Sequence, residues 1–494
     1  MKNILAALSA VTVLVLTPAL HQGRTNHAAK TDRSDKRDTS LNATISHLEA
    51  AIPKLMDEGD VPGLSIALIS NGTVGWSRAF GVKNTTTGEP ITETTVFEAA
   101  SLSKPVFAYA VLKLADQGRI ELDTPLSKYL PNYIGGDDRI NLITARMVLS
   151  HRTGFPNWRQ GPDVKILFTP GDRFSYSGEG FAYLGKVVER ITGKQFNDFM
   201  HDMVFAPLGM ANSSYVWRAD YDRLSATGHN EDRGPAWKGK PTAANPAASL
   251  HTTALDYAKF VIAVMKGVGL NPETAAMMLK PQVKVDPSCT ICTQAKPARV
   301  SDSLAWGLGV GLEHNPTGDS FWHWGDNGAF KCYMQAYPRL QTGVVVLTNS
   351  AYGLSIIPDI VDIAIGGSHP TFEWIKYDRY DSASHRLLKA VLKDGAGSAI
   401  KQYREAIISG QMTEGSVNSI GYVLLRSKRI KDSVAIFELN AQAHPESWNA
   451  YDSLGEAYME DGQKELAITN YKKAIELNPG NENGIRILKR LEAK

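Results

Sequence analysis

An internal repeat near the C-terminal end constrains the fold of this chain more than any other feature of its sequence. Residues of matching size recur there with a period of 34 residues. Small residues at fixed places let two helices approach closely, and the aromatic residue of each copy fills the gap between neighbours. The period therefore predicts an all-α tail of stacked helix pairs. The two copies consist of Ile420, Gly421, Leu424, Ser433, Phe437, Asn440 and Pro445, and of Leu454, Gly455, Tyr458, Ala467, Tyr471, Ala474 and Pro479.

This pattern resembles the tetratricopeptide repeat. One period further back, Ala399, Tyr403 and Ala406 match only the second helix of a worn copy. We therefore expect a tetratricopeptide-like domain at residues 396–494, in which residues 485–494 cap the stack, and a linker at residues 368–395. Such a tail either binds a protein or peptide partner or steadies the rest of the chain.

The N-terminal residues have the order of a secretory signal. Lys2 precedes an apolar run from Ile4 to Leu16, and small residues follow it. We expect a signal peptide at residues 1–20 and hence an exported protein, periplasmic or secreted. An uncleaved N-terminal anchor is the alternative, and only in that case do we expect membrane attachment. Residues 21–40 are polar and aperiodic, which predicts a disordered tether.

The composition argues against nucleic acid as a partner. Hydrophobic residues make up 43% and charged residues 21% of the chain, as in ordinary globular proteins. The formal net charge is +2, and no long block of like charges forms a basic face.

The three cysteines predict no metal site. Cys289 and Cys292 are separated by two residues, and a zinc site needs two more ligands that the neighbouring sequence lacks. We interpret the pair as a disulfide that staples a loop or as two idle thiols. Cys332 lies in a strand-like stretch and is expected to be a small buried hydrophobe.

Residues 41–367 have the pattern of a mixed domain. Two apolar runs, 64–70 and 73–82, flank Asn71-Gly72, which is a strong signal for a β-hairpin. Further strands are expected only late, at Phe330–Tyr337 and Gly343–Thr348, and an apolar helix follows them. Strands at both ends with a helix-rich region between them predict an antiparallel sheet packed by terminal helices, with a separate helical subdomain.

The strongest chemical signal is the tetrad from Ser101 to Lys104 at the start of a predicted helix. Residues three apart share a helix face, so Lys104 is expected beside the Ser101 hydroxyl. A partly desolvated lysine has a lowered pKa and accepts a serine proton. By itself the tetrad is also consistent with an ordinary N-cap serine. A second copy, Ser398 to Lys401, falls in the repeat tail, and we interpret it as coincidence.

Two further segments support a catalytic role for this tetrad. Tyr176-Ser177-Gly178 leads into an amphipathic helix, and His323-Trp324-Gly325-Asp326 precedes a strand. With the tetrad, they resemble the three motifs of the β-lactamase-related serine hydrolases, the group of class C β-lactamases, D-amino-acid carboxypeptidases and family VIII esterases. The resemblance covers about residues 45–350, and supporting matches lie at 149–154, 250–260 and 344–349.

This resemblance implies a fold and a set of roles. The expected fold is α/β (α+β), β-lactamase/transpeptidase-like, with an antiparallel sheet and a helical subdomain. Ser101 would be the nucleophile, and Lys104 would help to deprotonate it. Tyr176 would carry protons to the leaving group and the attacking water, with its pKa lowered by Lys104; its alternative is a packed aromatic residue. No metal or organic cofactor is implied.

The third motif implies the binding of the substrate. The backbone N–H groups of Ser101 and Asp326 would form the oxyanion hole, and Gly325 would let the substrate lie close to its strand. His323 stands where β-lactamases carry a permanently charged lysine. Trp322 and Trp324 should face away from His323, as core residues or as a wall of the substrate site.

Two departures from the family motifs shape the expected activity. Gly178 replaces an asparagine that would hold an acylamino group, and His323 is mostly neutral at neutral pH. We therefore expect an exported serine hydrolase that cleaves an ester or amide of a small molecule or peptide, with an esterase-like range. The alternatives are a penicillin-binding D-alanyl carboxypeptidase or β-lactamase, and a non-catalytic binding protein that works through its repeats.

Overall fold

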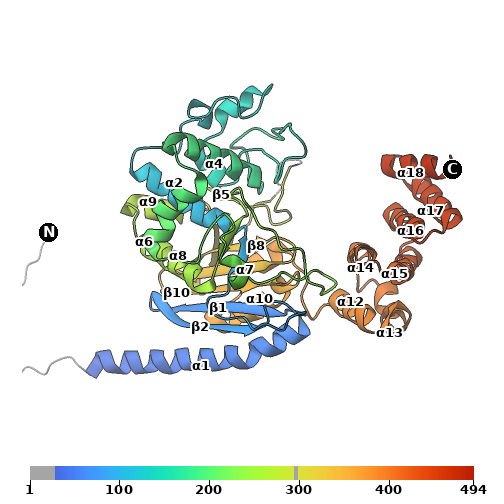
Figure 1. Ribbon diagram of the computed structural model, residues 1–494, viewed down its shortest axis with the longest axis horizontal. Helices are drawn as coiled ribbons and strands as arrows, with labels where there is room; N and C mark the ends of the chain where they lie inside the picture. The colour runs from blue at the N-terminus through green and yellow to red at the C-terminus, as the bar shows by residue number, and fades with distance from the viewer. Residues whose placement is uncertain (1–27, 294–298, 494) are drawn as a thin grey trace, which may run out of the picture. The chain divides into compact units, whose positions relative to one another are not determined.

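The computed structural model describes residues 28–293 and 299–493 (Figure 1). The predicted signal peptide, residues 1–20, therefore lies outside the described residues. Helix α1 spans Ala28–Glu58, so the later part of the predicted disordered tether is helical. The chain divides into two compact units, residues 1–43 and 44–494. Among the described helices, none has the length and apolar character needed to cross a membrane.

The second unit contains an eight-stranded antiparallel sheet with the strand order β2-β1-β10-β9-β8-β7-β6-β5 (Figure 1). The N-terminal strand β1 pairs with the late strand β10, which joins the two ends of the predicted domain. A small second sheet pairs β3 with β4. The strands are β1 Gly63–Ser70, β2 Thr73–Gly81, β3 Phe97–Ala100, β4 Leu250–Thr252, β5 Val283–Lys284, β6 Leu304–Trp306, β7 Gly311–Asn315, β8 Gly318–Asp326, β9 Lys331–Tyr337 and β10 Thr342–Thr348.

The predicted hairpin is confirmed at Asn71-Gly72. Strands β1 and β2 pair on either side of it, and both turn residues have positive φ, 52° and 67°. Asparagine and glycine tolerate this conformation, and such a turn matches the right-handed twist of the two strands. The local sequence therefore determines where the sheet begins.

Helices cover this sheet and form the predicted helical subdomain. Helix α2 lies inside the domain, with 11 of its residues buried, and it shares one core with α8 and with one face of β1 and β10. Helix α10 packs against β9 and β10. The helices are α2 Ser103–Asp116, α3 Ala145–Leu149, α4 Gly178–Thr192, α5 Phe196–Met200, α6 Ala206–Leu208, α7 Tyr221–Leu224, α8 Ala254–Lys266, α9 Pro272–Met278 and α10 Gly353–Ile365, with short helical turns at Leu126–Lys128, Asp138–Leu142 and His201–Phe205.

The tail forms the predicted helix pairs. A Cβ atom on Gly455 would lie 3.1 Å from the ring of Tyr471, and Gly421 faces the ring of Phe437 in the same way. The repeated glycine thus admits the aromatic residue of the partner helix, as the period predicts. The helices of the tail are α12 Ala383–Asp394, α13 Ala396–Ile408, α14 Glu414–Arg426, α15 Ile430–Ala443, α16 Trp448–Glu460, α17 Lys464–Leu477 and α18 Glu482–Glu492, and the short helix α11 Pro370–Ile375 precedes them.

The segment predicted as a linker, residues 368–395, contains two helices. Leu387, Leu388 and Val391 of α12 are buried in one core with Ala396 and Ala399 of α13. Helix α12 is therefore the first helix of the worn repeat, for which the sequence showed only the second. Its positions lack the repeat's small residues, so the period did not reveal it.

Helix α12 also binds the sheet-containing part of the unit. Asp60 Oδ2 lies 3.2 Å from His385 Nε2, and Asp60 Oδ1 lies 3.3 Å from Lys389 Nζ. Arg233 Nη2 completes the cluster and lies 2.7 Å from Asp60 Oδ2. Burial raises the pKa of Asp60, but the hydrogen bond with His385 and the charges of Arg233 and Lys389 outweigh it and hold that pKa below its usual range. The Asp60 carboxylate therefore connects α12, the first helix of the repeats, to the sheet-containing part of the unit.

These contacts predict that the tail stabilises the rest of the chain. We expect a chain that ends at residue 380 to melt at a lower temperature than the full chain. Asp60→Asn should lower the melting temperature of the full chain by about 2–8 °C, because a charged buried acceptor is lost. In the shortened chain the effect should be smaller, since His385 and Lys389 are absent. Differential scanning calorimetry of the four proteins provides the test.

Asp302→Asn is the matched control, because the side chain of Asp302 is fully exposed and its nearest cation, on Lys284, is 3.8 Å away. It should leave both melting temperatures unchanged. An Asp60→Asn effect of equal size in the two chain lengths would contradict docking of α12 through Asp60.

Candidate active site

Ser101 lies in a tight turn between β3 and α2. Ala100, the residue before it, has a φ of 49°, a conformation that is unfavourable for a residue with a side chain. Buried hydrogen bonds hold the turn: Ser103 Oγ donates to the Ala100 carbonyl (2.6 Å), and the Tyr257 hydroxyl donates to the Leu102 carbonyl (2.9 Å). Ser101 remains partly exposed, whereas the Ser103 hydroxyl is buried and engaged. Only Ser101 of the two serines is available to a substrate.

Lys104 lies directly beside Ser101, as the helical spacing predicts. Its side chain is fully buried, and its Nζ donates hydrogen bonds to Ser101 Oγ (2.9 Å) and to the Ala247 carbonyl (2.8 Å). The rings of Tyr176 and Trp158 lie 4.7 Å and 5.7 Å from this nitrogen. Burial lowers the pKa of Lys104 well below its usual value. The amine therefore loses its proton readily and has a lone pair for the proton of Ser101.

Tyr176 packs between two rings on the other side of Lys104. Its ring stacks on His151 at 4.3 Å and lies 4.9 Å from Trp324. Burial raises the pKa of Tyr176, with a smaller opposite contribution from the Ser101 hydroxyl. The expectation that Lys104 lowers this pKa is wrong, because burial of the phenol disfavours its charged form and raises the pKa instead. Tyr176 is thus a neutral phenol that can donate a proton.

His323 is fully buried on β8. Its Nδ1 lies 2.7 Å from the Trp324 carbonyl, and its Nε2 has no hydrogen-bond partner among the described residues. Burial and the nearby Lys104 lower its pKa to about 3. The imidazole is therefore neutral, as we predicted, but it presents no accessible surface to a substrate. It shapes the site from behind Tyr176, whose ring is 6.1 Å away.

Gly325 has a different role from the one we predicted. A Cβ atom on this residue would lie 2.5 Å from the Ala99 carbonyl oxygen and 3.3 Å from the Ala100 Cβ. Protein backbone, not substrate, occupies the space beside the glycine. Gly325 thus lets β8 approach the turn that carries Ser101.

At the C-terminal end of β8, the backbone edge that faces away from β9 is not paired with another described strand. Strand β7 pairs with β8 only as far as Trp322, whereas β9 pairs with it as far as Asp326. Residues 323–326 therefore have no ladder partner on the β7 side in the described part of the chain. This is the edge on which we predicted the Asp326 N–H of the oxyanion hole.

The side chain of Asp326 is held by residues that the sequence analysis missed. Lys331 Nζ lies 2.5 Å from Asp326 Oδ1, and the Tyr377 hydroxyl donates to Asp326 Oδ2 at 2.6 Å. Trp322 and Trp324 are both buried, as expected of core residues, and their rings lie 5.9 Å and 6.1 Å from that of Trp374. The expectation that Trp324 faces away from His323 is wrong, because the two rings stack with their centroids 5.3 Å apart. Trp374 and Tyr377 fall in the predicted linker, where no motif marked them.

Cys289 and Cys292 form a disulfide, so the loop staple is confirmed. The loop touches the second motif: the Tyr176 N–H donates to the Thr290 carbonyl at 2.9 Å. Asp286 and the two sulfurs are the one group with metal-ligand spacing in the described part of the chain, and the disulfide uses both sulfurs. Cys332 is a free, buried thiol, as expected.

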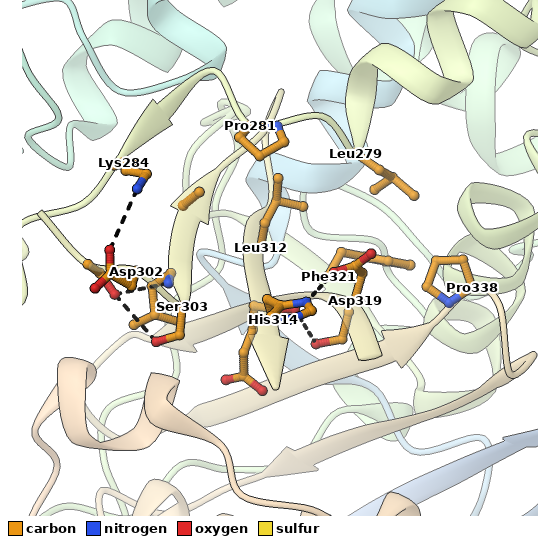
Figure 2. Close-up of a pocket in the computed structure, with 15 residues that line it drawn as sticks. Leu279, Pro281, Lys284, Asp302, Ser303, Leu312, His314, Asp319, Phe321 and Pro338 are labelled. Atoms are coloured by element: carbon orange, nitrogen blue, oxygen red, sulfur yellow. Dashed lines mark hydrogen bonds and ion pairs between the residues drawn. The ribbon is translucent and has the colours of Figure 1, made fainter. Parts of the chain in front are cut away.

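An apolar pocket of about 400 Å³ lies at the outer strands β5 to β8, and it contains none of the predicted site residues (Figure 2). Its titratable side chains have partners: Lys284 lies 3.8 Å from Asp302, His314 lies 2.7 Å from Asp319, and Glu313 lies 3.0 Å from His369. The pocket therefore has no part in the arrangement around Ser101.

Comparison with known proteins gives two family matches. The beta-lactamase family matches residues 48–359, and the tetratricopeptide repeat matches residues 448–481. Penicillin-binding protein 4 of Amycolatopsis lactamdurans is 25% identical over 356 residues, which make up 65% of this chain and 89% of that protein.

Solved structures share the fold. The octameric penicillin-binding protein homologue from Pyrococcus abyssi has a TM-score of 0.57 at 23% identity, over 70% of this chain and 82% of that one. The D-alanine carboxypeptidase AmpC from Burkholderia cenocepacia has a TM-score of 0.56 at 20% identity, over 66% of this chain and 99% of that one. The predicted β-lactamase/transpeptidase-like fold is confirmed.

The burial of Lys104 predicts the pH dependence of the reactivity of Ser101. Lys104 accepts a proton only in its neutral form, and burial places the loss of its own proton well below pH 10.5. We expect the rate at which a fluorophosphonate modifies Ser101 to rise with pH and to reach its plateau far below that value. Buried His151 and His323 both have lowered pKa values, so neither titrates in this rise near neutral pH.

The measurement is the labelling rate of the full chain as a function of pH, followed by mass spectrometry of the Ser101 peptide. Lys104→Arg should label slowly at every pH, because a guanidinium does not accept a proton. A wild-type rate that rises only near pH 10.5 would show that Lys104 keeps its charge in the folded protein.

Proposed function

This chain belongs to the beta-lactamase family of serine hydrolases, and we propose that it hydrolyses a small ester or amide through an acyl-enzyme on Ser101. One observation carries the proposal: the buried, deprotonatable amine of Lys104 lies 2.9 Å from the hydroxyl of a partly exposed serine. A base within hydrogen-bond reach of a nucleophile is the arrangement that covalent hydrolysis needs.

The proposed reaction has two half-reactions. Ser101 transfers its proton to Lys104 Nζ while its oxygen attacks the substrate carbonyl. The N–H groups of Ser101 and Asp326 stabilise the oxyanion that forms. Tyr176 then donates its phenolic proton to the leaving group and regains one from Lys104. In the second half-reaction water attacks the acyl-enzyme and its proton passes to the same pair; the pair returns that proton to the Ser101 oxygen as the acyl bond breaks, which releases the acid and restores the free enzyme.

The space beside the second motif supports a substrate without an acylamino group. A Cβ atom on Gly178 would lie 2.7 Å from the indole of Trp158 and 3.0 Å from the Asn157 carbonyl. Both chain neighbours of Trp158 are anchored to the second motif. The Asn157 carbonyl accepts hydrogen bonds from the N–H groups of Gly178 and Glu179 at 2.9 Å, and Arg159 forms an ion pair with the buried carboxylate of Glu179. An amide side chain at position 178 has no room in this arrangement.

The charge at the third motif supports the same substrate class. A penicillin or a D-alanyl peptide carries a carboxylate, and a fixed cation on the third motif would bind it. Here that position is His323, which is neutral and fully buried. A neutral ester needs no such cation.

We also propose export of the protein and a protein or peptide partner for the repeats. The signal-like pattern of residues 1–20 and the disulfide Cys289–Cys292 support export, because disulfides persist in oxidising compartments. N-terminal sequencing of protein recovered from its native host tests whether the segment is removed. The tetratricopeptide match supports the partner, since such repeats offer extended binding surfaces.

The nucleophile is tested by substitution. Ser101→Ala should abolish both fluorophosphonate labelling and ester turnover, because Ser101 is the one serine whose hydroxyl is hydrogen-bonded to Lys104 Nζ among the described residues. Ser398→Ala is the matched control, since Ser398 is the first residue of the second tetrad and lies exposed on α13. It should leave labelling and turnover at wild-type values. Undiminished hydrolysis by the Ser101→Ala protein would refute the mechanism.

The substrate class is tested by direct comparison. Short-chain p-nitrophenyl esters should be cleaved at least about 100-fold faster than a chromogenic cephalosporin, measured as kcat/KM on the same preparation. The reason is the combined absence of a cation at His323 and of an amide at Gly178. Equal turnover of the two substrates would instead favour a β-lactamase, and release of D-alanine from a peptide would favour a carboxypeptidase.

A further inference from the structure

Residues 369–377 pack against the active site although they lie beyond the matched family range, residues 48–359. Trp374 of α11 is almost fully buried, and its ring contacts those of Phe174, Trp306, Trp322 and Trp324. Its Nε1 donates to the Asp286 carbonyl at 2.7 Å. The helix is thus joined both to β8, which carries the third motif, and to the loop that contains the disulfide.

A buried carboxylate fixes the beginning of this helix. Glu313 on β7 is fully enclosed, and one of its oxygens accepts the Thr371 N–H at 3.1 Å. Its other oxygen lies 3.0 Å from His369 Nδ1 and accepts hydrogen bonds from Asn315 and Gln335. A buried carboxylate with this many partners is costly to disturb, so α11 has one defined place on the sheet.

Tyr377 follows α11 and reaches the third motif. Its hydroxyl donates to Asp326 Oδ2 at 2.6 Å, while Lys331 Nζ and the Gly328 N–H bind the other oxygen. Burial, and next the charge of Asp326, raise the pKa of Tyr377, so the phenol keeps its proton and remains a donor. Three donors therefore hold one carboxylate at the open end of β8.

We propose that Tyr377 is a positioning residue of the active site: delivered by α11, its hydroxyl fixes Asp326 so that the Asp326 N–H points at the oxyanion. The proposal rests on the proposed function, in which that N–H stabilises the transition state. Residues 369–377 are then a part of the hydrolase that completes its oxyanion hole, and they do not serve as a linker. A small displacement of such a donor weakens the transition state more than the ground state.

The test is Tyr377→Phe in the full chain, which removes one hydroxyl and keeps the ring. We expect kcat for a p-nitrophenyl ester to fall about 5- to 20-fold while KM stays within about twofold, since the lost interaction acts in the transition state. The melting temperature should change by less than about 3 °C, because the variant loses a single hydrogen bond and keeps the ring. Tyr380→Phe is the control, because Tyr380 lies three residues further on and is not among the described hydrogen-bond partners of the Asp326 side chain, and it should keep wild-type kinetics.

A double-mutant cycle with Asp326→Ala identifies the route of the effect. Once the Asp326 carboxylate is absent, Tyr377→Phe should cost almost nothing further, because the two residues act through one hydrogen bond. Wild-type kcat in Tyr377→Phe, or additive losses in the double variant, would overturn the positioning role and leave the proposed function intact. A wild-type chain without Ser101-dependent turnover would overturn both.

Discussion

The site depends on the burial of one lysine. Lys104 is enclosed by aromatic rings, and in the described structure its Nζ donates hydrogen bonds to the Ser101 hydroxyl and the Ala247 carbonyl. Burial raises the free energy of the charged form of the amine and so lowers its pKa. The neutral form, which burial favours, is the form that accepts a proton. Burial of Tyr176 likewise disfavours its charged form and raises the pKa of the phenol, so desolvation favours the neutral form of both side chains.

The surrounding elements bring three separate segments against this pair. The strained turn at Ala100 presents Ser101, and Gly325 lets β8 lie close to that turn. The Thr290 carbonyl of the disulfide loop accepts a hydrogen bond from the Tyr176 N–H, and the Tyr377 hydroxyl donates one to Asp326 Oδ2. The reactive groups themselves are few, whereas most of the structure around them serves to keep them in place.

The sequence predicted the parts of the site that follow from local periodicity and from the family motifs. The Ser101–Lys104 contact follows from helix geometry, and the hairpin follows from the Asn71-Gly72 turn. It did not predict the direction of the Tyr176 pKa, because desolvation depends on side chains that arrive from other segments. It also missed α12, since that helix buries its leucines against α13 without the small residues that mark a repeat.

The sequence by itself therefore determined the mixed domain and the repeat tail through short-range spacing, whereas the order of the three motifs and the reactive residues proposed here rest on the family resemblance. Tertiary structure alone decided how those residues behave. The lowered pKa values of Lys104 and His323, the space that Trp158 takes beside Gly178, and the hydrogen bond from Tyr377 to Asp326 all arise from contacts between residues far apart in the chain. Burial and close packing are properties of the folded chain, and no local pattern of residues encodes them.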